Sequence, residues 1–239
     1  MHEPSLPTGA TATVNHARRV VNSIPALAAL SGEIQNALAR QMAPRSYNTG
    51  QIVCTEGDPD VSLFLLEKGW IKGVRMAEGG REQAVIVLRD GDVFGAEAVF
   101  SQASYPWTVM ALEVVTAWTI EGAGARALAN RHPALAMACL EHLGTRACYY
   151  IQLVEDLSLR NVPARLAHTL LSHAESQDGQ LVVPRRTWTT LDEMAARLGT
   201  VRDVLSRALN SLEADGILHL ERNRIVLLDP KKLLERGRA

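Results

Sequence analysis

Residues 189–218 read TTLDEMAARLGTVRDVLSRALNSLEADGIL, and this stretch decides the fold of the C-terminal third of the chain. Thr190 and Glu193 stand three residues apart before an apolar-periodic run, which is the spacing of a capping box at a helix start. Gly199 then supplies a sharp turn, and a second helix is predicted to begin at 200–203 and to end before Gly216. Two short helices joined by a tight glycine-containing turn predict a helix-turn-helix motif.

The second predicted helix has an apolar side and a polar side. At about 100° per residue, the apolar side chains fall together and are expected to pack on the first helix: Val201, Val204, Leu205, Ala208, Leu209 and Leu212. The other side carries Arg202, Asp203, Ser206, Arg207 and Asn210. Arginine suits the guanine acceptors, a carboxylate suits the cytosine amino group, and serine suits several base edges. We therefore expect Arg202, Asp203, Ser206 and Arg207 to read DNA bases, although on an isolated helix such a side would be merely solvated.

Two apolar runs follow, at 217–220 and 225–228, separated by the basic segment Glu221-Arg222-Asn223-Arg224. This pattern predicts a β-hairpin with a charged tip, which after a helix-turn-helix would form the wing of a winged helix. Contacts to phosphates position a protein on the duplex without reading its sequence. We expect such contacts from Thr190, Thr200, Arg185, Arg186, Arg222 and Arg224.

The formal net charge of −1 conceals an asymmetry along the 239 residues. Residues 160–239 contain 13 Lys and Arg against 10 Asp and Glu, whereas residues 1–159 contain 12 against 16. A basic module joined to an acidic body is typical of a nucleic-acid-binding protein. No apolar run approaches the roughly 20 residues of a membrane helix. The cysteines, Cys54, Cys139 and Cys148, are odd in number and scattered, so no disulfide framework is expected and a cytoplasmic location is predicted.

The rest of the chain divides into segments that differ in residue composition and hydrophobic pattern. Residues 1–22 have no apolar signal core and are predicted to be a disordered leader. Between 47 and 120, short Val-, Ile- and Leu-rich runs alternate with turn signals, which predicts an antiparallel sandwich or barrel within a domain over 23–132. Residues 133–160 read as one long helix. The last domain, 161–239, begins with Asn161 as a helix cap and Pro163 in the first turn.

The long helix carries apolar residues at alternating steps of four and three. Such a heptad seam is typical of a two-stranded coiled coil, so we expect a homodimer through this helix. The alternative is a single amphipathic helix that packs on its own domain. The expected seam consists of Leu140, Leu143, Ala147, Tyr150, Val154 and Leu157.

Three motifs together resemble the CRP/FNR family of bacterial transcription regulators: the glycine pattern from Gly50 to Gly69, the run 91–95 (GDVFG), and the run 199–207 (GTVRDVLSR). The resemblance covers about 27–234. It implies an α+β architecture with an N-terminal antiparallel β-roll of the double-stranded β-helix or jelly-roll type, a long dimerisation helix and a C-terminal winged helix-turn-helix. It also implies a palindromic double-stranded DNA site and contact with RNA polymerase. The family usually has Glu where this chain has Asp203, so the half-site need not be the usual one.

The sensor domain departs from family members that bind cyclic AMP. Their ribose-binding Glu is replaced by Ala96, and their phosphate-binding Arg-Ser pair aligns with Tyr105-Pro106 or Pro106-Trp107. A cyclic phosphate needs a buried cation or a nest of donors, so the usual response to cyclic AMP is not expected. The residues at the usual effector pocket are Gly95, Ala96, Glu97, Tyr105, Trp107, Tyr150 and Ile151.

Other cofactors find little support in the sequence. Iron–sulfur members need four cysteines, and residues 47–131 contain no His for haem. No cofactor or metal is therefore expected, although a redox role for the Cys54 thiol stays open. Two alternatives remain: a regulator that needs no effector, and one that senses an unidentified, less polar molecule.

The sequence thus predicts a homodimeric, sequence-specific DNA-binding regulator. A second class also fits, namely a ligand-binding signalling module whose winged helix contacts protein. No catalytic order of Ser, His and Asp, metal-ligand spacing or phosphate-binding loop is present, so an enzyme is not expected.

Overall fold

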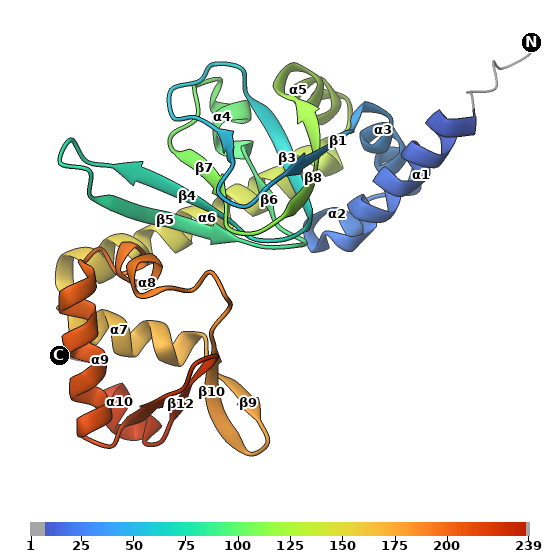
Figure 1. Ribbon diagram of the computed structural model, residues 1–239. Helices are drawn as coiled ribbons and strands as arrows, with labels where there is room; N and C mark the ends of the chain where they lie inside the picture. The colour runs from blue at the N-terminus through green and yellow to red at the C-terminus, as the bar shows by residue number, and fades with distance from the viewer. Residues whose placement is uncertain (1–7, 238–239) are drawn as a thin grey trace, which may run out of the picture. The chain divides into compact units, whose positions relative to one another are not determined.

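The computed structural model describes residues 8–237 and divides them into two units (Figure 1). The first unit consists of residues 8–74 and 86–148. The second consists of residues 75–85 and 149–237.

Three helices begin the first unit: α1 (Thr8–Ser23), α2 (Pro25–Ala28) and α3 (Gly32–Gln41). The backbone N–H of Ile34 donates to Ser31 Oγ over 3.5 Å, which caps α3. Helix α1 differs from the leader predicted over 1–22. That prediction is wrong for residues 8–22, and residues 1–7 lie outside the described residues. The helix forms because Ala17, Val20 and Val21 share one face and are buried.

Two four-stranded antiparallel sheets follow, as expected for a β-roll. The first has the order β1-β8-β3-β6, with β1 (Ala43–Tyr47), β8 (Val115–Glu121), β3 (Ser62–Lys68) and β6 (Val93–Phe94). The second has the order β2-β7-β4-β5, with β2 (Ile52–Cys54), β7 (Thr108–Ala111), β4 (Ile71–Met76) and β5 (Glu82–Leu88). Helix α4 (Ala96–Ser101) lies between β6 and β7, and α5 (Gly122–Arg131) follows β8.

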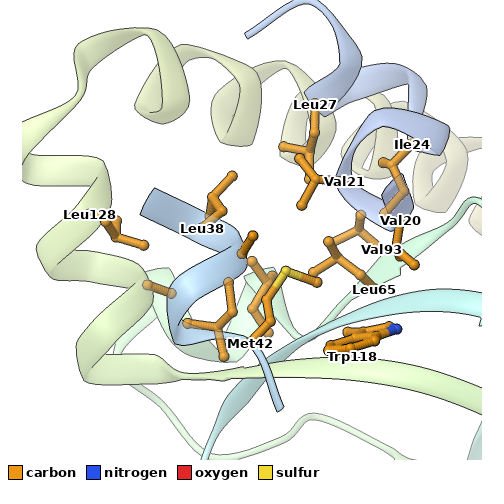
Figure 2. Packing of buried hydrophobic residues seen from close by; sticks show 14 of the residues in the cluster. Val20, Val21, Ile24, Leu27, Leu38, Met42, Leu65, Val93, Trp118 and Leu128 are labelled. Carbon is orange, nitrogen blue, oxygen red and sulfur yellow. The ribbon is translucent and has the colours of Figure 1, made fainter. Parts of the chain in front are cut away.

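The core of the first unit lies between its helices and the first sheet. Figure 2 shows apolar side chains from α1, α2, α3 and α5 meeting those of β3, β6 and β8. The indole N–H of Trp118 donates to Glu67 Oε2 over 3.0 Å, and the other oxygen of Glu67 lies 2.5 Å from His16 Nε2 of α1. Apolar burial and this polar contact together hold α1 on the sheet.

Helix α6 (Pro133–Leu159) is the predicted long helix, with Leu135 and Ala138 buried in the first unit. The first turns of α6 thereby form part of the sensor core. Its C-terminal turns, from residue 149, belong to the second unit.

The second unit is a winged helix. Its helices are α7 (Val162–Ser172), α8 (Leu191–Arg197), α9 (Arg202–Ala214) and α10 (Pro230–Arg236). Its sheet has the order β11-β12-β10-β9, with β11 (Leu218–Leu220), β12 (Arg224–Leu227), β10 (Gln180–Pro184) and β9 (Glu175–Gln177). The predicted cap at Asn161 is confirmed, because its Oδ1 accepts from the Ala164 N–H at 3.0 Å. The predicted wing hairpin is also confirmed, with Leu218 opposite Leu227.

Candidate nucleic-acid interface

The turn between α8 and α9 is built by a cap and a glycine. Thr190 Oγ1 accepts from the backbone N–H of Glu193 at 3.2 Å, which confirms the predicted cap of α8. Gly199 has φ +62°, a conformation that residues with a Cβ adopt only at a cost. A Cβ at this position would lie 2.6 Å from Leu157 Cδ2 of α6. The positive φ therefore favours glycine at the turn, and a Cβ there would also displace the end of the Leu157 side chain.

The two sides of α9 separate as the sequence predicts. Leu205, Leu209 and Leu212 are buried in the core of the second unit. The backbone of Val201 caps α9, and its side chain is exposed, so it leaves the expected apolar side. The polar side is available: Arg202, Asp203 and Arg207 are exposed, and Ser206 is half-buried.

Both arginines on the exposed side of α9 make contacts within the protein. Arg202 Nη1 lies 3.1 Å from Asp192 Oδ2 of α8, and these side chains are 61% and 65% exposed. Arg207 Nε donates to the backbone carbonyl of Asp203 at 3.3 Å, which holds its guanidinium along the helix. Arg202 thus contacts a carboxylate and Arg207 a backbone carbonyl, and both contacts are weak and exposed.

The candidate phosphate contacts differ in exposure. Thr190 is exposed and Thr200 half-buried. Arg185 is half-buried and its Nη2 donates to the Thr189 carbonyl at 3.3 Å, whereas Arg186 is exposed.

At the wing, Arg222 is exposed, but Arg224 donates twice to Glu221, over 2.8 Å and 3.3 Å. These hydrogen bonds raise the pKa of Arg224 and lower the pKa of Glu221. Of the two wing arginines, Arg222 is therefore better placed for a phosphate.

A support for α8 was not predicted from the sequence. The guanidinium of Arg197 lies over the Trp188 ring, 4.9 Å from its centroid, and its Nε is 3.8 Å from Glu193 Oε1. Burial lowers the pKa of Arg197, and Glu193 itself is buried. The spacing of Glu193 and Arg197, four residues apart on one helix, is the signal from which this pair could have been predicted.

The expected effector pocket of the sensor is filled where it lies in the first unit. Tyr105 is buried, and its hydroxyl accepts from the Ser62 N–H at 2.7 Å and donates to the Ser62 carbonyl at 3.1 Å. Trp107 is buried beside Gly73, where a Cβ would lie 3.0 Å from the indole Cδ1. An indole therefore occupies space next to the bare backbone of β4.

The other first-unit pocket residues lie at the start of α4. Gly95 has φ +87°, and a Cβ there would clash with the Ser62 carbonyl oxygen. Ala96 is buried and Glu97 half-buried in the first turn of the helix. None of these three residues carries a positive charge that could pair with a phosphate.

The predicted dimer seam is only partly exposed. Leu140 and Val154 are 60% and 62% exposed, and Ala147 is also exposed. Leu143, by contrast, packs against the core of the first unit. Tyr150 and Leu157 are half-buried, and Leu157 lies against the Gly199 turn.

The described residues also bear on the other chemical expectations. Cys54 is buried, and desolvation raises its pKa to about 12, which argues against a reactive thiolate there. Within residues 8–237, no group of three or more His, Cys, Asp or Glu side chains is arranged to hold a metal ion. No helix in the same range combines the length and apolar character required to cross a membrane.

Comparison with known proteins agrees with this architecture. The Cyclic nucleotide-binding domain family matches residues 44–132, and the Crp-like helix-turn-helix domain family matches residues 164–236. The "CRP-like cAMP-activated global transcriptional regulator" of Mycobacterium tuberculosis is 26% identical over 206 residues, covering 84% of this chain and 91% of its own length. The "Global nitrogen regulator" of Synechococcus elongatus is 24% identical over 195 residues, covering 78% and 86%.

Solved structures share the fold. FixK2 from Bradyrhizobium japonicum has a TM-score of 0.72 at 20% identity, covering 83% of this chain and 98% of that protein. Both of these curated relatives are named as global regulators, and the Mycobacterium tuberculosis protein is named as a transcriptional one. A cyclic-nucleotide-binding domain, a long helix and a Crp-like helix-turn-helix in this order, with matching relatives along most of the chain, show that this protein belongs to the CRP/FNR family of transcription regulators.

Proposed function

We propose that the protein is a homodimer that reads a palindromic DNA site through its two α9 helices. The observation that carries the proposal is the N-terminal half of α9, where Arg202, Asp203 and Arg207 are exposed while the opposite side is buried. Recognition helices present these N-terminal residues to the major groove. The function is exerted on DNA in the cytoplasm.

Each side chain on this surface suits a particular base edge. An arginine donates two hydrogen bonds to guanine O6 and N7, and a carboxylate accepts from cytosine N4. Asp203 is one methylene shorter than the glutamate usual in the family, so a cytosine contact requires a closer helix or a bridging water. Ser206 supplies a further hydroxyl at the same surface.

The exposed apolar stripe of α6 is the proposed dimer interface. Met137, Leu140, Ala147, Ile151 and Val154 are all exposed, and they follow one another at steps of three and four once Gly144 is included. This stripe shares Leu140, Ala147 and Val154 with the sequence-predicted seam. It has Gly144 and Ile151 in place of Leu143 and Tyr150, adds Met137 and leaves out Leu157. Leu143 packs against the core of the first unit, and Leu157 lies against the Gly199 turn. A stripe with this period suits a second parallel copy of the helix.

Sedimentation of a charged variant tests the dimer. A variant carrying both Leu140→Glu and Ile151→Glu places two like charges in the stripe, so we expect a monomer at concentrations where the wild type is a dimer. Leu228→Glu is the matched control, because Leu228 is also an exposed leucine but lies outside α6. A dimer that survives the double substitution would exclude this interface.

Selection from a random DNA library tests the function itself. A homodimer should enrich palindromes whose half-sites lie about 10 bp apart. Binding should weaken steeply as salt rises, because phosphate contacts release counterions. Enrichment of no sequence, with binding that ignores salt, would instead favour a winged helix that contacts protein.

We also propose that cyclic AMP does not activate the protein in the usual manner. Ala96 lacks the ribose-binding carboxylate, and the buried Tyr105 and Trp107 fill the region where family members hold the phosphate. Calorimetric titration with cyclic AMP should therefore show no saturable heat.

A further inference from the structure

Val201 presents an apolar side chain to solvent at the start of the proposed DNA-reading surface. The helical period of the sequence groups it with the buried residues of α9, yet the valine is 53% exposed. It is the N-cap residue and its backbone is extended, with φ −112° and ψ 156°. Because it precedes the first helical turn, its side chain does not continue the buried side formed by Leu205, Leu209 and Leu212.

Valine is also an unfavourable residue for the start of a helix. An N-cap side chain with an oxygen accepts a hydrogen bond from a first-turn N–H, whereas valine has no such acceptor. Helices α7, α8 and α10 of the same unit follow the rule, because Asn161, Thr190 and Asp229 each accept such a bond. Val201 makes no side-chain cap bond. Positions that break a local rule without a gain in packing are often functional ones.

The neighbours of Val201 are the side chains already proposed to read bases. Arg202 comes next and its side chain is 61% exposed, and Asp203 follows it and is also exposed. A recognition helix places its N-terminal residues at the base edges of the major groove. The polar edges there suit arginine and carboxylate, and the apolar feature of that groove is the C5-methyl group of thymine. An exposed valine at this end of α9 suits that methyl group.

We propose that Val201 is a specificity-determining residue whose methyl groups contact the C5-methyl group of a thymine in the half-site. The inference rests on the proposed function, because it requires α9 to lie in the major groove. It also adds to that function. Arg202, Asp203 and Arg207 favour G·C pairs through hydrogen bonds, whereas Val201 adds a preference for an A·T pair through an apolar contact.

Uracil tests the contact directly, because it differs from thymine only in lacking this methyl group. Full-length protein is titrated by fluorescence anisotropy with the palindrome obtained by library selection, in which each thymine is replaced by uracil in turn. We expect one position of the half-site at which uracil weakens binding by roughly two- to fourfold, from the loss of one buried methyl group. Replacement in both half-sites should weaken binding by roughly four- to sixteenfold, because distant contacts add.

Three variants connect this effect to Val201. Val201→Ser removes both methyl groups and introduces a favourable N-cap, so it should bind the thymine and uracil palindromes alike without a loss of thermal stability. Val201→Ile keeps a branched apolar side chain and should keep the preference for thymine. Leu234→Ser is the matched control, since Leu234 is also an exposed apolar residue of the second unit but lies on α10. It should leave the preference unchanged.

The ratio of the two affinities separates the methyl contact from a merely structural role. A change in capping or in stability alters the affinity for both palindromes by the same factor, so it leaves the ratio as it was. The assignment of Val201 is overturned if the selected half-site contains no thymine, or if no uracil replacement weakens binding. It is overturned equally if the uracil effect persists in Val201→Ser, because another group would then contact the methyl.

Failure of this inference is distinguishable from failure of the proposed function. A library that yields no enriched sequence would contradict the proposed function, and the role of Val201 with it. An enriched palindrome that binds equally well with uracil would contradict the role of Val201 alone and leave the base contacts of Arg202, Asp203 and Arg207 standing.

Discussion

Replacing Asp192 by asparagine should tighten DNA binding. In the free protein, the carboxylate of Asp192 accepts from Arg202, with 3.1 Å between Oδ2 and Nη1. An arginine that gives two hydrogen bonds to guanine must leave or rearrange this contact. Asparagine keeps the size of the side chain but removes its charge.

The magnitude follows from the exposure of the pair. Exposed ion pairs contribute about 0.2–1 kcal/mol, and more than half of each side chain is exposed here. The release of Arg202 should therefore raise the affinity by roughly 1.5- to 5-fold at low salt. The gain should decline as salt rises because salt screens exposed charges. Asp192 also lies in the first turn of α8, so its loss should lower the stability of the fold by about 0.3–1 kcal/mol.

Fluorescence anisotropy with a selected palindrome and with random DNA of the same length measures the effect at several salt concentrations. Asp215→Asn is the matched control, since Asp215 also pairs with an exposed arginine, Arg236, at 2.9 Å but lies at the other end of α9. Asp192→Asn is also introduced into an Arg202→Ala variant. The difference between its effects on DNA affinity in the two backgrounds gives the interaction energy of the two side chains. Thermal melting checks that the variants are folded.

The reasoning fails if Asp192→Asn binds the palindrome less tightly than the wild type, because Asp192 would then orient Arg202 rather than compete for it. It fails equally if the same gain persists when Arg202 is alanine. If Asp215→Asn raised the DNA affinity by the same factor, the cause would be the loss of general repulsion between a carboxylate and the DNA phosphates rather than the release of Arg202.

Four further outcomes are expected. Arg207→Ala should cost about 1–3 kcal/mol of specific affinity and relax discrimination at one base position, measured by repeating the library selection; an unchanged ratio of specific to random binding would reject its role. Gly199→Ala should lower the free energy of unfolding by about 1–3 kcal/mol, because φ is +62° and a neighbour stands in the way, as denaturant titration can show. Because burial holds the pKa of His142 below 6.5, the unfolded chain takes up a proton that the folded chain does not, so stability should fall as the pH drops below about 6.5. His142→Leu should show a smaller fall, and an identical pH dependence would contradict the assignment. Cys54 should resist thiol reagents at neutral pH until the protein unfolds, since its pKa is about 12.

Much of the winged helix could be predicted because its signals are local. The caps at Asn161 and Thr190 need only a side-chain oxygen three residues before a free N–H. The buried side of α9 follows from its helical period. Val201 does not lie on that side, because it is the N-cap residue and precedes the first helical turn. Tertiary pairs such as Arg197 on Trp188 join separate segments, so their ring contact was not visible in the sequence.

The dimer stripe shows where a periodic signal becomes ambiguous. Helix α6 carries apolar residues on two adjacent stripes, one that packs on its own units and one that is exposed. Sequence alone cannot tell which stripe is already covered, so the heptad period places Leu143 in the interface although it packs against the core of the first unit. For α1, the spacing of Ala17, Val20 and Val21 was a usable helical signal, but the preceding polar residues concealed it.

Because Gly73 has no side chain, the Trp107 indole packs directly against its backbone, so the residue types at positions 73 and 107 constrain each other. Any side chain there would press on the indole of Trp107 and on Ile86. Homologues that gain a larger residue at position 73 should therefore carry a smaller one at 107, and the two should change together over evolution. A nucleotide response could be engineered into this domain only after the indole of Trp107 is removed. An arginine and a serine introduced beside the buried indole would leave no room for the phosphate that they are meant to bind.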